Sequence, residues 1–165
     1  MILIYLAIIL SVYLLVAAAW DLRTLHIPTW LTVPAVAAVL VWRTWQFDMA
    51  FLPFWFGCLV AWQFHWVTAG DAQVLMVLFG FFPNALMLYV LVLVAGLGLA
   101  TVLVVRYGRV HALPLLFRRF KHQLTELSFL RPSKAELEWA GEPFTIFIST
   151  AGLIYIWIFA MGLGG

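Results

Sequence analysis

The chain has 165 residues, of which 66% are hydrophobic and only 10% are charged, with a formal net charge of +2. Its length suits one domain, and its mean hydropathy of +1.08 excludes the ordinary soluble class. Its single cysteine, Cys58, excludes an internal disulfide and a cysteine-rich zinc site, and the small positive charge gives no reason to expect a nucleic-acid partner. We therefore expect one all-α, membrane-embedded domain over residues 1–165.

Hydropathy predicts a bundle of six transmembrane helices, at 2–20, 28–45, 49–67, 72–83, 84–105 and 143–163. The first apolar run is too long for the core of a signal peptide and lacks a basic segment before it, so we expect a retained helix. Only the fourth segment is short, because a helix over 72–83 is about 18 Å long. Its start is therefore expected at, or slightly inside, the membrane boundary.

Charge predicts the orientation of these helices. Seven of the nine Lys and Arg residues lie in the loop 106–142, which the positive-inside rule assigns to the cytoplasm. A five-span model with one helix over 72–105 fits the charges equally well, but that helix would be about 51 Å long, and Pro83-Asn84 is a turn signal inside it. Six spans are therefore favoured, with the carboxylates of Asp21 and Asp71 on the cytoplasmic side of the inner (plasma) membrane.

The basic loop contains a segment with apolar residues at helical spacing and cations on the other face. The apolar residues are Leu113, Leu116, Phe117, Phe120, Leu124 and Leu127. This pattern predicts an amphipathic helix, which would lie on the cytoplasmic leaflet with its cations toward anionic headgroups. A solvated connector docked on the bundle is an equally open interpretation.

Asp21 and Asp71 are the most informative residues, because an ionisable side chain at a membrane span indicates function. Asp21 ends the first predicted span, and Pro28 suits the first turn of the next helix, where its missing N–H costs nothing. Asp71 follows Gly70, which permits a sharp turn at the start of the fourth helix. Two carboxylates at neighbouring span ends suggest a pair that performs chemistry.

These contexts resemble the type IV prepilin peptidase family of membrane aspartic proteases, which includes the preflagellin peptidases. That family has an Asp followed by an arginine and by an Ile-Pro-Asn-like start to the next helix. The chain matches it at Asp21, Arg23, Ile27, Pro28 and Leu31. The start of the last predicted helix at Pro143-Phe144 is also similar, so the resemblance extends over most of the chain in layout.

The second motif of the family, Gly-x-Gly-Asp with a lysine two positions on, is matched in part. Gly70-Asp71 agrees, but Thr68 stands where the first glycine belongs and Gln73 where the lysine belongs. Thr68 adds a β-branched side chain and loses access to positive φ, so it would strain or reshape a backbone that needs that conformation. Gln73 removes a cation, although neither change removes a carboxylate.

The resemblance implies aspartic proteolysis that needs no metal and no cofactor. Asp21 and Asp71 would share one proton, the ionised carboxylate activating water and the protonated one polarising the scissile carbonyl. Asp71 lies near a helix N-terminus, which favours negative charge, and Asp21 lies near a helix C-terminus, which does not. We therefore expect Asp71 to be the base and Asp21 the proton carrier.

The resemblance also implies the partners: a prepilin or pseudopilin precursor with a short basic leader, membrane lipid, and the proteins of a pilus or secretion machine. Larger family members add a Cys-rich methyltransferase domain, to which nothing here corresponds, so we expect a peptidase alone. The cytoplasmic loop has a net charge of +3 and should not attract a basic leader. Glu142, beside the last helix, is the candidate for a local acidic contact.

Other interpretations remain open. The chain could be a degenerate relative that acts as a non-enzymatic membrane component of an assembly machine, with Thr68 and Gln73 marking lost activity. A proton-coupled transporter would also use two acids, but it predicts acids near the bilayer midplane and an internal repeat. Structural roles are ion pairing of Asp21 with Arg23 and helix N-capping by Asp71.

The remaining polar and small residues have structural interpretations. We expect His26 to face solvent and Asp48 to be a surface charge beside Arg43. Cys58 is expected to pack inside the bundle. Gly96-Leu97-Gly98 should permit close helix contact.

Overall fold

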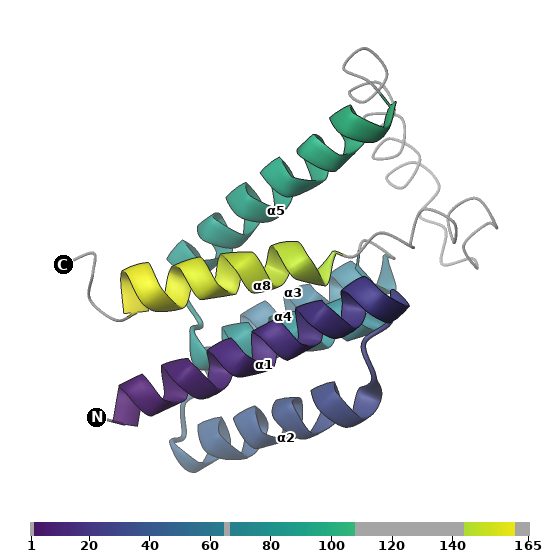
Figure 1. Ribbon diagram of the computed structural model, residues 1–165. Helices are drawn as coiled ribbons and strands as arrows, with labels where there is room; N and C mark the ends of the chain where they lie inside the picture. Colours follow the sequence, from purple (N-terminus) through teal and green to yellow (C-terminus); the bar gives the residue numbers. More distant parts are fainter. Residues whose placement is uncertain (1, 65–66, 108–143, 161–165) are drawn as a thin grey trace.

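The computed structural model describes residues 2–64, 67–107 and 144–160. The secondary structure of this part of the chain is all-helical, as predicted. It contains six α-helices, which form the bundle shown in Figure 1. They are α1 (Ile2–Thr24), α2 (Thr29–Trp45), α3 (Leu52–Gln63), α4 (Ala69–Phe81), α5 (Ala85–Tyr107) and α8 (Thr145–Ile154), the last continuing as the π-helix η1 (Tyr155–Ala160).

Helix α4 is the centre of the bundle. Nine of its 13 residues are buried, and it packs against α2, α3 and α8. Helix α8 in turn packs against α1 and α5, so α5 joins the bundle through α8 and extends away from it (Figure 1). Because other helices surround α4, its sequence is apolar on every face, apart from its first turn and Gln73.

Two glycines allow close helix contacts: Gly152 between α8 and α1, and Gly98 between α5 and α8. A Cβ added at Gly152 would come within 2.8 Å of Leu14 Cδ1, so α8 and α1 are in direct contact there. A Cβ at Gly98 would overlap the ring of Phe147, whereas Gly96 has no such neighbour within 4 Å. The predicted close helix contact is therefore confirmed for Gly98 and wrong for Gly96.

Helix α1 is longer than predicted. It continues to Thr24 instead of ending at residue 20, so Asp21 lies in its last turn and not beyond it. The helix ends where Leu25 adopts a φ of 53° and its N–H donates to the Asp21 carbonyl at 2.7 Å. The left-handed conformation at Leu25 thus terminates the helix without a glycine.

Helix α3 is shorter than predicted, and α4 is shifted along the chain. Helix α3 occupies Leu52–Gln63 and not 49–67, since Pro53 begins it and a turn bond from the Leu52 N–H to the Met49 carbonyl precedes it. The fourth segment is therefore not the only short one. Helix α4 begins three residues earlier than predicted and ends at Phe81, and the predicted break before the fifth helix is confirmed.

The last predicted helix, 143–163, is described as α8 and η1, which begin at Thr145. The amphipathic helix predicted within the loop 106–142 lies outside the described residues, as does Glu142. Cys58 is buried, as expected, and packs within the hydrophobic core.

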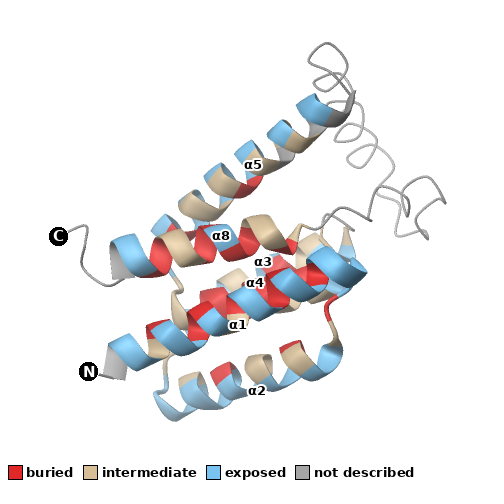
Figure 2. Cartoon of the chain, in the orientation of Figure 1, coloured by how far each residue is buried: buried red, intermediate tan, exposed pale blue. Residues whose placement is uncertain are grey.

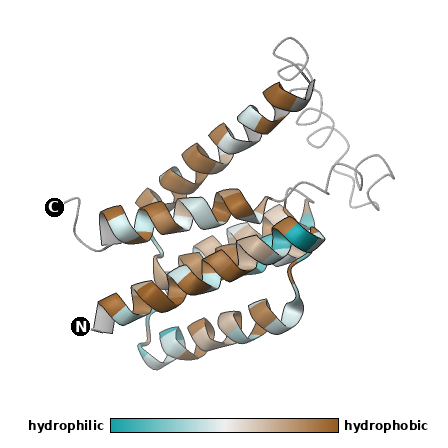
Figure 3. Cartoon of the chain, in the orientation of Figure 1, coloured by the Kyte–Doolittle hydropathy of each residue, from teal (hydrophilic) through white to brown (hydrophobic). Residues whose placement is uncertain are grey.

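Two helices of the described chain are long and apolar enough to cross a membrane: Ile4–Thr24 and Ala85–Val102. Most turns of these two helices that are coloured exposed in Figure 2 are brown in Figure 3, apart from the C-terminal turn of α1, which is teal. Their outward faces are therefore largely apolar. The large exposed apolar side chains on α5 are Leu86, Leu88, Tyr89, Val92, Leu93, Leu97, Val104 and Val105. Monomeric soluble proteins rarely expose so continuous an apolar surface.

Candidate active site

The two predicted aspartates come together at one end of the bundle. Asp21 projects from the last turn of α1 and Asp71 from the first turn of α4, and their exposed fractions are only 6% and 3%. The two carboxyl groups are close enough to interact electrostatically. Fifty residues of sequence separate them, so the packing of the helices creates the pair.

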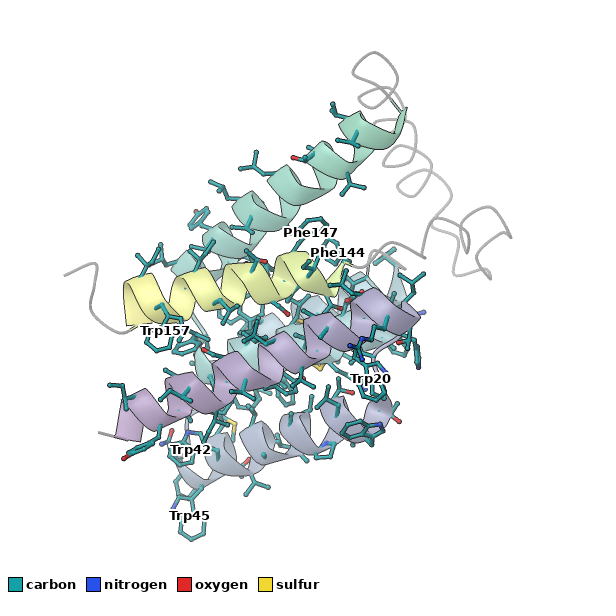
Figure 4. The ribbon with its side chains drawn as sticks, in the orientation of Figure 1. Trp20, Trp42, Trp45, Phe144, Phe147 and Trp157 are labelled. Carbon is teal, nitrogen blue, oxygen red and sulfur yellow. The ribbon has the colours of Figure 1, made fainter. Side chains whose placement is uncertain are left out.

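Thr145 connects the two carboxyl groups. This residue is fully buried at the start of α8, its backbone N–H donates to Asp21 Oδ2 at 3.2 Å, and its hydroxyl donates to Asp71 Oδ1. Phe144, the N-cap of α8, has no side-chain oxygen, so Asp21 satisfies one of the free N–H groups of the first turn. Figure 4 shows Phe144 at the start of α8. Three helices therefore meet through one threonine.

Thr68 holds Asp71 from the other side through a capping box. The Thr68 hydroxyl accepts the Asp71 N–H at 3.2 Å and donates to Asp71 Oδ2 at 2.8 Å, while the Thr68 N–H donates to the same Oδ2 at 3.2 Å. Thr68 is thus the N-cap of α4 and Asp71 its third residue, so the interpretation of Asp71 as the N-cap is wrong.

The strain expected at Thr68 is absent. Its backbone has φ −72° and ψ 165°, an extended conformation that a β-branched residue adopts readily. The condition under which threonine would strain this position, a backbone that needs positive φ, is therefore not met. The side chain instead supplies two of the hydrogen bonds that orient Asp71.

Gly70 is needed for packing and not for a turn. It lies within the first turn of α4, with no positive φ, so the predicted sharp turn at this residue is wrong. A Cβ added there would lie 2.9 Å from the Cβ of Ile27, which is buried beside it. Ile27 precedes Pro28, which is the extended N-cap of α2 and not part of its first turn as predicted, because the helix starts at Thr29, one residue later than expected. Gly70 therefore lets the α1–α2 connection approach Asp71 closely.

The cation beside Asp21 does not pair with it. Arg23 is exposed, and the described residues contain one ion pair, between Arg43 and Asp48 at the opposite end of α4. The structural interpretation of Asp21 as a partner of Arg23 is therefore wrong, whereas the pairing of Asp48 beside Arg43 is confirmed. His26 is exposed, as expected, and is close enough to act electrostatically on Asp21.

Gln73 contacts a neighbouring helix and not the aspartates. Its Oε1 accepts a hydrogen bond from the hydroxyl of Thr32, a buried residue of α2. In a tightly packed interior this bond satisfies the Thr32 hydroxyl donor and the Gln73 amide oxygen. Gln73 therefore joins α2 to α4 below the site.

The two carboxyl groups have unequal hydrogen bonding. Asp71 accepts three bonds, two at Oδ2 from Thr68 and one at Oδ1 from Thr145. Asp21 accepts the Thr145 N–H at Oδ2, and the Thr145 side chain also lies within hydrogen-bonding reach of it, so all its donors in the described chain come from one residue. Asp21 also faces the N-terminus of α8, a field that the dipole argument from α1 alone omitted. The hydrogen bonds, and not the dipoles, distinguish the two acids.

Sequence reasoning missed two residues of this site. The capping role of Thr68 had a signal, because Thr68 and Asp71 have the three-residue spacing of a capping box. Thr145 had none beyond its place after the predicted helix start at Pro143-Phe144. Its role depends on how α8 packs against α1 and α4.

No protein-family model matches the chain, and neither the curated proteins nor the solved structures include a match. In the described residues, no three His, Cys, Asp or Glu side chains gather as metal ligands. What distinguishes this site is the pair of buried carboxyl groups of Asp21 and Asp71 and their hydrogen bonds to Thr145 and Thr68.

Proposed function

We propose that this protein is a membrane aspartic endopeptidase that removes the short basic leader of prepilin-like proteins at the cytoplasmic membrane boundary. One observation carries the proposal: two buried carboxyl groups, on different helices, are held together by Thr145, and neither forms an ion pair with a described residue. Burying two acids together is costly, so a structure that does so indicates a use for the pair.

The hydrogen bonds support a division of labour within the pair. Asp71 Oδ2 takes both bonds from Thr68, which leaves Oδ1, bonded once to Thr145, as the oxygen with a lone pair for a water proton. Asp21 has donors from Thr145 alone in the described chain, so it has acceptor capacity left to carry the shared proton. Asp71 is then the base and Asp21 the proton carrier.

The reaction follows from these roles. Asp71 takes a proton from water, whose oxygen attacks the scissile carbonyl carbon while Asp21 donates a hydrogen bond to the carbonyl oxygen. The tetrahedral intermediate collapses when the C–N bond breaks and the leaving amine takes a proton from the pair. Thr145 keeps both carboxyl groups in register throughout, because one residue bonds to each of them.

In this proposal the protein is a multi-pass membrane bundle, and the end that holds Asp21 and Asp71 faces the cytoplasm. Two helices of sufficient length and the apolar outer faces of α1 and α5 support it. The substrate would be cut where its basic leader meets its apolar helix, which places the scissile bond at the depth of Asp21 and Asp71. Glu142 stays a predicted contact for the leader.

The test is cleavage of a candidate prepilin co-expressed in membranes with the full-length protein. Asp21→Asn and Asp71→Asn keep the side-chain shape but remove the ionisable oxygen, so each should lower the cleavage rate by at least about a thousandfold. Asp48→Asn, a matched change at the opposite end of α4, should leave the rate within about threefold of wild type.

Two outcomes would contradict the proposal. Cleavage that survives both Asn variants at Asp21 and Asp71 would make the aspartates structural. Wild-type protein that is well expressed but inert on several prepilins would favour the degenerate relative, a non-enzymatic component of an assembly machine. The geometry at Thr68 favours the active enzyme, because the departure from the family motif strengthens the hold on Asp71.

A further inference from the structure

Exposed aromatic side chains gather at the two ends of the bundle. The near belt, at the end that holds the aspartates, consists of Trp20 on α1, Trp30 on α2 and Trp62 on α3. The far belt consists of Tyr5, Trp42, Trp45 and Trp157. Figure 4 shows Trp20 at one end and Trp42, Trp45 and Trp157 at the other. Tryptophan and tyrosine in such positions anchor helices at the two membrane–water interfaces.

The surface between the belts is apolar. Helix α1 exposes Ile8, Ile9, Val12, Leu15 and Val16 between Tyr5 and Trp20. On α2, the stretch between Trp30 and Trp42 exposes Val33, Leu40 and Val41. Trp55, in the first turn of α3, faces inward, because its indole N–H donates to the Met76 carbonyl at 2.7 Å. Acyl chains are the surroundings that such a surface suits.

The belts are closer together than the faces of an ordinary bilayer. Tyr5 and Trp20 are fifteen residues apart on α1, and Trp30 and Trp45 are fifteen residues apart on α2. Fifteen residues of α-helix rise about 22 Å, and any tilt shortens the span across the membrane. The hydrocarbon region of a typical bilayer is about 30 Å thick. On both helices the distance between the belts is therefore about 8 Å less than this thickness.

We propose that the face formed by α1 and α2 binds a bilayer with a hydrocarbon region about 22 Å thick, and so thins an ordinary bilayer around the aspartates. The inference rests on the proposed membrane function. Helix α5 carries exposed apolar side chains from Leu86 to Val105, nineteen residues or about 28 Å, and it diverges from the bundle (Figure 1). Thinning is therefore confined to the α1–α2 face.

Thinning has a consequence for the chemistry. Asp21 follows Trp20 directly, so the pair of carboxyl groups lies at the level of the near belt. Where the bilayer thins, headgroups and water come to this level. Water, which the proposed hydrolysis consumes, thus reaches the buried pair without a channel through the bundle.

The test uses the full-length protein in phosphatidylcholine vesicles with monounsaturated chains of 14, 18 or 22 carbons. Brominated forms of each lipid quench tryptophan fluorescence, and competition between brominated and ordinary lipids gives relative lipid affinities. We expect the 14-carbon lipid to bind about threefold more tightly than the 18-carbon lipid, and the 22-carbon lipid to bind least tightly. Equal affinity, or tightest binding of the 18- or 22-carbon lipid, would overturn the proposal.

A double variant tests whether the far belt sets the preference. Trp42→Leu with Trp45→Leu should reduce the preference for the 14-carbon lipid to below about 1.5-fold, because the aromatic anchors at that end are gone. Phe56→Leu, an exposed change in the middle of α3, should leave the preference unchanged. A double variant that keeps the wild-type preference, or alters self-association instead, would contradict the role given to the far belt.

This measurement needs no substrate, so it separates the two proposals. Quenching with a preference for long chains would overturn the thin-bilayer inference and leave the peptidase proposal intact. No quenching by any brominated lipid would contradict membrane embedding itself, on which both proposals depend.

Discussion

The two ends of α4 hold acids in opposite ways. At its C-terminal end, the Arg43 guanidinium pairs with Asp48 and also donates to the carbonyls of Gly80 and Phe81. At its N-terminal end, Asp71 and its neighbour Asp21 are buried and form no ion pair with a described residue, and their hydrogen bonds come from hydroxyl and amide donors. The C-terminal end of α4 thus pairs its acid with a cation, whereas the N-terminal end brings two acids together.

The difference shows how to separate structural acids from chemical ones in this bundle. An ion pair that also satisfies the last carbonyls of a helix contributes to folding and leaves its carboxylate occupied. The two carboxyl groups at the other end form no ion pair with a described residue, and they have acceptor capacity left. Substitutions at the C-terminal end should therefore change stability, and substitutions at the N-terminal end should change the reaction.

The largest effect on stability is expected from Arg43→Gln. It removes a largely buried cation and leaves the carbonyls of Gly80 and Phe81 without donors, so it should lower the free energy of unfolding by about 3 kcal/mol. Asp48→Asn, which removes only the more exposed partner, should cost about 0.5–1 kcal/mol. Thermal or denaturant unfolding in detergent micelles measures both.

Prepilin cleavage per folded molecule provides the control for Arg43→Gln. It should stay within about threefold of wild type, since Arg43 is at the far end of α4 from the aspartates. A variant with unchanged stability and lost cleavage would show that the C-terminal end also belongs to the reaction, and the contrast between the two ends would fail.

At the N-terminal end, Thr145→Val should lower kcat by about 10- to 100-fold, or roughly 1.4–2.7 kcal/mol. Valine keeps the shape of threonine and its N–H to Asp21, but it removes the hydroxyl bond to Asp71. KM should change little, because the hydroxyl orients the carboxyl groups and not the substrate. Steady-state cleavage of a prepilin peptide separates the two constants.

Thr145→Ser is the matched control, because serine restores the hydroxyl with a smaller side chain. It should retain kcat within about threefold of wild type. If Thr145→Ser were as impaired as Thr145→Val, the methyl group and core packing would matter, and the positioning role of the hydroxyl would be refuted.

The sequence allowed the helical class and most helix positions to be predicted, because apolar runs and turn signals are local. The break around Pro83-Asn84 is an example, since it divides α4 from α5 where expected. Boundaries that depend on capping or backbone conformation were missed: α1 passes residue 20 until Leu25 turns left-handed, and α4 starts early because Thr68 caps it.

For the site, the pair of aspartates was predictable because acids are rare in such a sequence. Its connection through Thr145 was not, because the contact joins residues 124 positions apart and follows from the packing of α8 against α1. The effect of Gly70 was also misjudged. A glycine before an aspartate suggests a turn locally, while the close Ile27 side chain that requires it lies in another segment.

The smallest effect is expected from Thr68→Gly, which restores the glycine of the family motif. The capping box would be lost, but glycine is itself tolerated at an N-cap, so the free energy of unfolding should fall by about 0.5 kcal/mol. Asp71 would lose the hydroxyl bond at Oδ2, so cleavage should fall by about two- to fivefold. Faster cleavage than wild type would instead mean that Thr68 impairs the site, as the degenerate-relative interpretation requires. The sign of this small change therefore decides whether the threonine is a loss of function or a second way of holding the same carboxylate.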